Sequence, residues 1–93
     1  MSYKRVNRRT EGEVRQAILI HFLDARPVKG MQNEEPFKQW VDDQTLTWTR
    51  IKTVRLSMMT AGLLEQMRGT TADLVLRTTP LGKQAMETVP SGD

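Results

Sequence analysis

The fold is decided by residues 47–64, TWTRIKTVRLSMMTAGLL. Thr47 is a favourable helix N-cap, because its hydroxyl can accept a hydrogen bond from a free backbone N–H one turn later. Gly62 is the expected stop, since glycine adopts the left-handed conformation after a helix without steric cost. Between them, apolar side chains recur at spacings of three and four and share one helix face: Ile51, Val54, Met58 and Ala61.

The opposite face of this predicted helix carries hydroxyls and cations. Its residues are Thr49, Lys52, Thr53, Ser57 and Thr60, with Arg50 and Arg55 at the margins. Such side chains bind phosphate and form hydrogen bonds with base edges, so the face is a candidate nucleic-acid contact. The alternative is an ordinary solvated helix face, and this stretch alone favours neither.

The composition narrows the class of protein. The chain has 93 residues, of which 38% are hydrophobic, enough for one small core. Cysteine is absent, which excludes disulfides and thiolate metal sites and fits an intracellular location, in the cytoplasm or nucleoid or in a host cytoplasm for a viral protein. No apolar run approaches the length of a membrane span, and no secretory signal is recognised.

The net charge of +3 is unevenly distributed. Residues 1–9 carry no acidic side chain and contain Lys4, Arg5, Arg8 and Arg9. The segment before the basic helix holds Glu34, Glu35, Asp42 and Asp43. A basic end, a basic helix and an acidic middle favour a polyanionic partner that approaches from one side. A basic tail without a partner is the alternative.

The first half of the chain predicts a flexible basic arm and two helices. Residues 1–9 form the arm, and residues 10–13, TEGE, match a capping box that opens a helix over about 11–25. Its buried stripe is Val14, Ala17, Ile18, His21, Phe22 and Ala25. Pro27 disfavours helical geometry in the residue before it and ends this helix.

The second helix is predicted over about 34–43, with Asn33 as its N-cap and Phe37, Trp40 and Val41 on one face. Before it, Val28 and Met31 are candidates for a very short strand. After Gly62 the pattern changes to alternation, which predicts strands over 63–68 and 73–79 around a turn at 69–71. A short last helix is expected over 81–89, followed by a frayed tail at 90–93.

Three helices, a hairpin and a last helix are the element order of a winged helix domain. Residues 61–86, AGLLEQMRGTTADLVLRTTPLGKQAM, resemble the end of the recognition helix and the wing of MarR-like and PadR-like winged helix-turn-helix proteins. The matching positions are Gly62, Leu63 and Leu64, and then Thr79, Pro80, Leu81 and Gly82. The resemblance implies a mainly α fold with a small β-hairpin, and a domain over residues 10–89.

The resemblance also implies a double-stranded DNA-binding transcriptional regulator whose third helix lies in the major groove. The implied DNA-contacting residues are Thr47, Thr49, Arg50, Lys52, Thr53, Arg55 and Ser57 on this helix, Arg68, Thr70 and Thr71 in the wing, and Lys4, Arg5, Arg8 and Arg9 in the arm. Arg50 or Lys52 is the candidate guanine contact. Arg55, nearer the buried side, is expected to contact phosphate or to pair with a carboxylate of the second helix.

Proteins of this kind bind mostly as homodimers, although the 93 residues contain no counterpart of the long terminal helices through which MarR-like proteins dimerise. We expect no cofactor, no metal, no small-molecule ligand, no membrane partner and no catalytic residue, because no nucleophile–base pair, phosphate loop or ligand cluster is recognised. The alternative is a winged helix that contacts another protein through its acidic second helix and through Leu56 and Met59. An RNA-binding version of the basic face also stays open.

Overall fold

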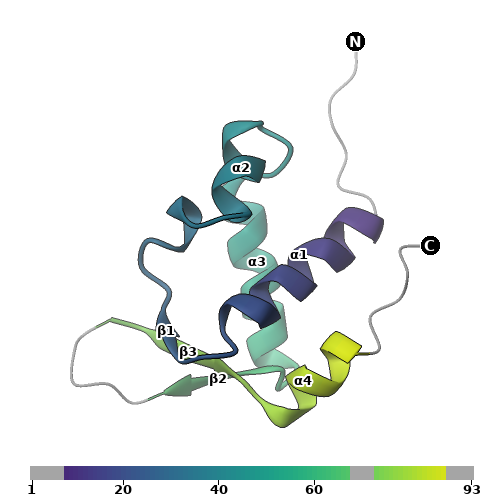
Figure 1. Cartoon of the computed structure of the whole chain (residues 1–93), viewed down its shortest axis with the longest axis vertical. Helices are drawn as coiled ribbons and strands as arrows, with labels where there is room; N and C mark the ends of the chain where they lie inside the picture. Colours follow the sequence, from purple (N-terminus) through teal and green to yellow (C-terminus); the bar gives the residue numbers. More distant parts are fainter. Residues whose placement is uncertain (1–7, 68–72, 88–93) are drawn as a thin grey trace.

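The computed structural model describes residues 8–67 and 73–87, with side chains described from residue 11 onward. In chain order the elements are α1 (Arg8–His21), β1 (Arg26–Pro27), the 3₁₀ helix η1 (Met31–Asn33), α2 (Phe37–Asp42), α3 (Trp48–Thr60), β2 (Leu64–Met67), β3 (Val75–Thr78) and α4 (Pro80–Glu87). In Figure 1, α1 crosses α3 and the sheet lies at the lower end of both helices. The predicted mainly helical fold with a small antiparallel sheet is therefore confirmed.

The predicted start and apolar stripe of α3 are both present. The hydroxyl of Thr47 accepts a hydrogen bond from the backbone N–H of Arg50 at 3.1 Å, which caps the helix as expected. The stripe residues Ile51, Val54 and Met58 are buried. The apolar side of α3 is therefore packed in the core from Ile51 to Met58.

The predicted stop at Gly62 is also confirmed. This residue has a φ of 83°, a left-handed conformation that favours glycine. The N–H of Leu63 donates to the carbonyl of Met58 at 2.9 Å, and the N–H of Gly62 donates to that of Met59 at 3.1 Å. These two bonds form a Schellman motif and satisfy carbonyls at the helix end. Ala61, expected on the buried stripe, lies in this cap and is exposed.

The first helix is displaced from its predicted position. It begins at Arg8, so Thr10 lies inside the helix and does not cap it. It ends at His21, well before Ala25, because the following chain extends and pairs with β3. Pro27 is accommodated because β1 lies at the edge of the sheet.

The second helix is shorter than predicted. Asn33 closes η1 and does not cap α2, and the extended conformation of Glu34 separates the two helices. Pro36 occupies the N-cap position of α2 without a side-chain cap. Phe37 is buried as expected, and Trp40 and Val41 pack against the core.

The sheet has the order β1-β3-β2 and is antiparallel throughout. Leu64 pairs with Thr78 and Met67 with Val75, which joins the two predicted strands in one register. The short strand expected near Val28 lies earlier, at β1. The predicted turn at 69–71 lies outside the described residues.

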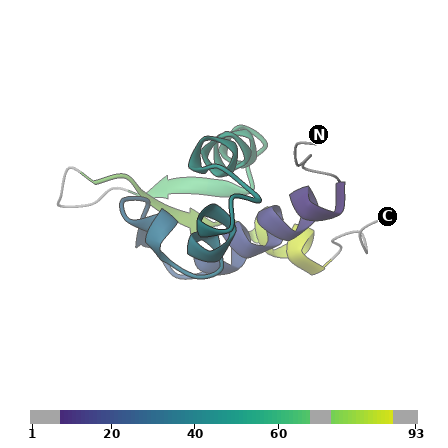
Figure 2. The same ribbon diagram turned by 90° about the horizontal axis from the view of Figure 1, so that it is seen from above.

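The core lies where α1, α3 and the sheet meet. Its buried apolar side chains are Val14, Ile18, Leu19, Phe22, Met31, Phe37, Leu46, Ile51, Val54, Met58, Leu64 and Leu76. Figure 2 shows α3 along one side of the molecule, with α1 and α4 together on the other. The side of α3 that turns away from α1 is therefore left at the surface. None of the described helices has the length and apolar character needed to cross a membrane.

Candidate nucleic-acid interface on α3

A tight turn after α2 sets the direction in which α3 leaves. The carbonyl of Trp40 accepts hydrogen bonds from the N–H groups of Thr45 at 3.0 Å and Leu46 at 3.2 Å, and from the Thr45 hydroxyl at 3.0 Å. Gln44 adopts a left-handed φ of 61°, which reverses the chain. Leu46 is buried in the core, and it fixes the chain directly before the first turn of α3.

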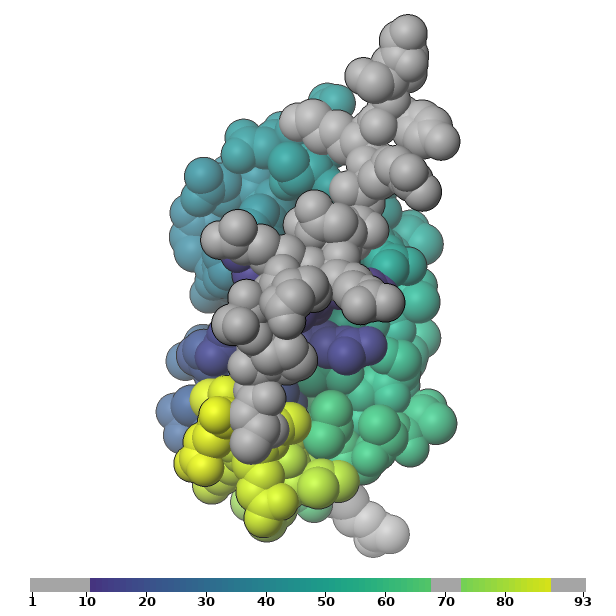
Figure 3. Space-filling model, turned by 90° about the vertical axis from the view of Figure 1, so that its right-hand side faces the viewer, coloured from purple at the N-terminus to yellow at the C-terminus, as the bar shows by residue number. Residues whose placement is uncertain are grey.

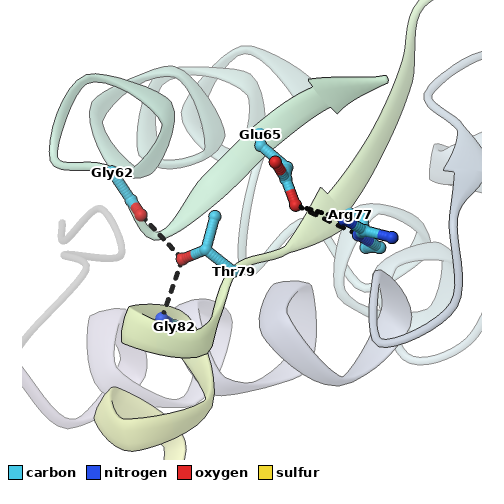
Figure 4. Close-up of polar contacts among 5 residues, drawn as sticks. All are labelled: Gly62, Glu65, Arg77, Thr79 and Gly82. Atoms are coloured by element: carbon cyan, nitrogen blue, oxygen red, sulfur yellow. Dashed lines mark hydrogen bonds and ion pairs between the residues drawn. The ribbon is translucent and has the colours of Figure 1, made fainter. Parts of the chain in front are cut away.

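The other end of α3 is tied to α4 through one hydroxyl (Figure 4). Thr79 Oγ1 donates to the carbonyl of Gly62 at 2.7 Å and accepts from the N–H of Gly82 at 3.0 Å. A side chain at Gly82 would force the backbone to shift, because its Cβ would lie 2.4 Å from the carbonyl oxygen of Leu63. The two sets of residues that carry the winged helix resemblance are thus joined to each other.

An ion pair crosses the two long strands. Arg77 on β3 donates to the carboxylate of Glu65 on β2 through Nε at 3.0 Å and through Nη2 at 2.7 Å (Figure 4). The two residues are directly opposite in the register, which suits such a pair. This contact connects the hairpin strands beside the end of α3.

The exposed side of α3 is polar except for Leu56. Its exposed residues are Thr49, Lys52, Thr53, Leu56, Ser57 and Thr60. Figure 3 shows α3 forming one edge of the molecule, in green. Within residues 8–67 and 73–87, no acidic side chain forms an ion pair with Lys52. Its ammonium is therefore a charge that this surface presents to solvent.

Three of the four exposed hydroxyls of this face are turned to the helix itself. Thr53 Oγ1 donates to the carbonyl of Thr49 at 2.9 Å. Ser57 Oγ donates to that of Val54 at 2.8 Å, and Thr60 Oγ1 donates to that of Leu56 at 3.2 Å. Each hydroxyl keeps acceptor lone pairs for an outside group, but its proton is already used.

Arg50 makes a contact that sequence reasoning missed. Its guanidinium forms an ion pair with the carboxylate of Glu11 on α1, and both side chains are only about a third exposed, 39% and 32%. The two residues are 39 positions apart, so no local pattern indicates the pair. Arg50 thus lies at the junction of α1 and α3, to one side of the exposed face.

Arg55 is buried, with 4% of its surface exposed. Its Nη1 contacts the sulfur of Met59 at 3.8 Å, and its Nε has no hydrogen-bond partner among the described residues. Burial lowers the pKa of the guanidinium from its ordinary value. The expected ion pair with a carboxylate of α2 is not formed among the described residues.

The remaining predicted contacts lie mostly outside the described part of the chain. These are Lys4 and Arg5 in the arm and Arg68, Thr70 and Thr71 in the wing. Arg8 and Arg9, assigned by sequence to the arm, belong to the first turn of α1 by their backbone. The structure therefore brings Thr49, Lys52, Thr53 and Ser57 to one surface, with the capping Thr47 at its start.

Comparisons with other proteins add no identification. No family model, no curated protein and no solved structure matches this chain. In residues 8–67 and 73–87, no group of three or more histidine, aspartate or glutamate side chains is placed to hold a metal ion. The function is therefore inferred from the geometry of α3.

Proposed function

We propose that this protein is a winged helix-turn-helix domain that binds double-stranded DNA inside the cell and regulates transcription. In this proposal α3 enters the major groove, and the segment between β2 and β3 together with the N-terminal arm contacts the backbone. Binding as a homodimer to two half-sites about one helical turn apart fits the symmetry of such regulators. No cofactor and no catalysis are proposed.

The order of the elements supports the winged helix assignment. A short helix, α2, and a tight turn precede α3, and a β-hairpin follows it directly. The first strand, β1, completes the sheet on the far side of β3. This arrangement leaves one face of α3 at the surface and places the hairpin directly after its C-terminal end.

One observation carries the functional proposal: α3 buries its apolar side and exposes a face of threonines and a lysine that pairs with no acidic side chain among the described residues. An α-helix fits the width of the major groove, and hydroxyls and lysine bind phosphates and base edges. Lys52 is exposed at one margin of that face, in the N-terminal half of α3. A basic N-terminal segment in the same chain adds positive charge for a polyanion.

Selection from a randomised duplex pool, followed by fluorescence anisotropy across a salt series, tests this proposal. Lys52→Ala should weaken binding and reduce the log–log salt slope by about 0.9, the value for one lost phosphate contact. Lys83→Ala is the matched control, because Lys83 is an exposed lysine on α4. An equal effect of both variants, or no duplex binding by the unmodified protein, would remove α3 from DNA recognition.

A protein partner is the second candidate, and the exposure of Leu56 favours it. This side chain is 44% exposed on a helix whose other large apolar residues are buried or half-buried. Asp42 and Asp43 give the neighbouring α2 exposed acidic groups. Binding that survives nuclease treatment and high salt would support a protein contact, whereas loss at moderate salt would support nucleic acid.

A further inference from the structure

The exposed face of α3 has an apolar centre. Thr49, Thr53, Leu56 and Thr60 follow one another at spacings of four, three and four residues, so they form one line along the helix. All are exposed, and Leu56 is 44% exposed. Among the described residues it is the one large apolar side chain of α3 that is exposed. Any ligand that lies along α3 must cover it.

Three of the hydroxyls around Leu56 are poor hydrogen-bond donors. The hydroxyls of Thr53, Ser57 and Thr60 each donate to a carbonyl of the helix. What they offer outward is acceptor capacity, and the two threonines also carry γ-methyl groups. Arg50, the strongest potential donor nearby, is held to the side by Glu11. Lys52 is the charged donor of this face.

The exposed face of α3 matches an A·T base pair better than a G·C base pair. In the major groove a G·C pair presents the acceptors N7 and O6 of guanine and the amino donor of cytosine, but no methyl group. An A·T pair presents the adenine amino group, a donor, and the thymine 5-methyl group, an apolar surface. The exposed leucine is complementary to the thymine methyl group, which a G·C pair lacks, and the acceptor hydroxyls suit the adenine amino group of the same pair.

We infer that the exposed face of α3 recognises A·T base pairs in the major groove, and that Leu56 packs against the 5-methyl group of a thymine. This inference rests on the proposed DNA binding, and it specifies which base pairs α3 prefers. The surface around Leu56 suits DNA better than an apolar groove of a protein partner. The side chains in line with Leu56 on α3 are threonines, and Lys52 lies beside it.

Deoxyuridine substitution tests the inference, because uracil lacks only the methyl group of thymine. The selected duplex is compared with copies in which single thymines of the half-site are replaced by deoxyuridine. The unmodified protein should lose affinity by about fourfold at the contacted thymine, which corresponds to about 0.8 kcal/mol for one buried methyl group. Leu56→Ala should bind the thymine duplex more weakly and lose little further affinity on deoxyuridine.

Leu81→Ala is the matched control, since Leu81 is 52% exposed on α4 and should keep the full sensitivity to deoxyuridine. Circular dichroism verifies that each variant is folded. Equal deoxyuridine sensitivity in Leu56→Ala and the unmodified protein would overturn the role of Leu56. Insensitivity of the unmodified protein at every thymine would overturn methyl recognition while leaving DNA binding in place. Failure to bind any duplex would overturn the proposed function itself.

Discussion

Arg50 of α3 and Glu11 of α1 form an ion pair that joins the N-terminal ends of these two helices. The pair is partly exposed, so its contribution to folding is small, less than about 1 kcal/mol. The larger consequence of the pair is that it removes a positive charge from this part of the surface. The carboxylate neutralises a guanidinium that would otherwise lie beside the proposed DNA-binding face.

Glu11→Gln should therefore increase the affinity for DNA of any sequence. The freed guanidinium of Arg50 gains access to a phosphate, which should make the log–log salt slope steeper by about 0.9. Anisotropy with a random duplex across a salt series measures both quantities. Asp24→Asn is the control with the same change of charge, because Asp24 is exposed beyond the other end of α1. A slope that changes equally in both variants contradicts this role for Glu11.

Gly82→Ala should destabilise the fold by about 1–3 kcal/mol. The added Cβ would lie 2.4 Å from the carbonyl oxygen of Leu63 and 2.7 Å from Cγ2 of Thr78, and backbone must move to relieve the first contact. Urea unfolding followed by circular dichroism measures the change. Gly12→Ala is the control, because a Cβ there meets nothing within 4 Å and should stabilise α1 by about 0.5–1 kcal/mol. Equal effects of the two variants would show that Gly82 is not closely packed.

Arg55→Met should leave the free energy of unfolding unchanged or raise it, by up to about 3 kcal/mol. The buried guanidinium has an unpaired Nε, and methionine retains the length of the apolar stem. Arg77→Met, which breaks an exposed ion pair, should instead cost less than about 1 kcal/mol. Urea unfolding compares the two. A clear loss of stability in Arg55→Met would indicate a favourable contact of the guanidinium.

His21 should make stability depend on pH. Its ring packs edge-on against Phe22 and Phe37, and burial, with Arg26 adding to it and Glu34 opposing it, lowers its pKa from 6.5. The unfolded chain therefore binds the proton more readily, so the free energy of unfolding should fall as pH falls through about 6.5 towards the lowered folded value.

His21→Phe keeps an aromatic ring at this position and removes the titrating imidazole. The chain has one histidine, so no other side chain of ordinary pKa titrates in the same range. Urea unfolding at a series of pH values should show a smaller decline in the variant than in the unmodified protein. Parallel declines would mean that His21 does not contribute.

Local signals predicted α3 well. Thr47 caps it, Gly62 ends it, and the apolar spacing of Ile51, Val54 and Met58 defines its buried side. These features depend on neighbouring residues, and the packing of the helix agrees with them. The alternation of Leu74 to Arg77 also indicated a strand whose pairing with β2 is confirmed.

Features set by distant contacts were missed. The end of α1 depends on the pairing of Arg26 and Pro27 with β3, some fifty positions later in the chain. The capping box at Thr10 is present in the sequence, but the helix continues through it. The partner of Arg50 lies on another helix, and Arg55, which helical periodicity placed only at the margin of the buried side, is buried by tertiary packing.

An NMR titration with the selected duplex tests the central claim most directly, because it maps the bound surface residue by residue. The amide signals of Thr49, Lys52, Thr53 and Leu56 should shift most, while those of exposed residues on α4, such as Lys83 and Gln84, should stay in place. The largest shifts on α4, with α3 unchanged, would contradict the proposal that α3 is the DNA-binding helix.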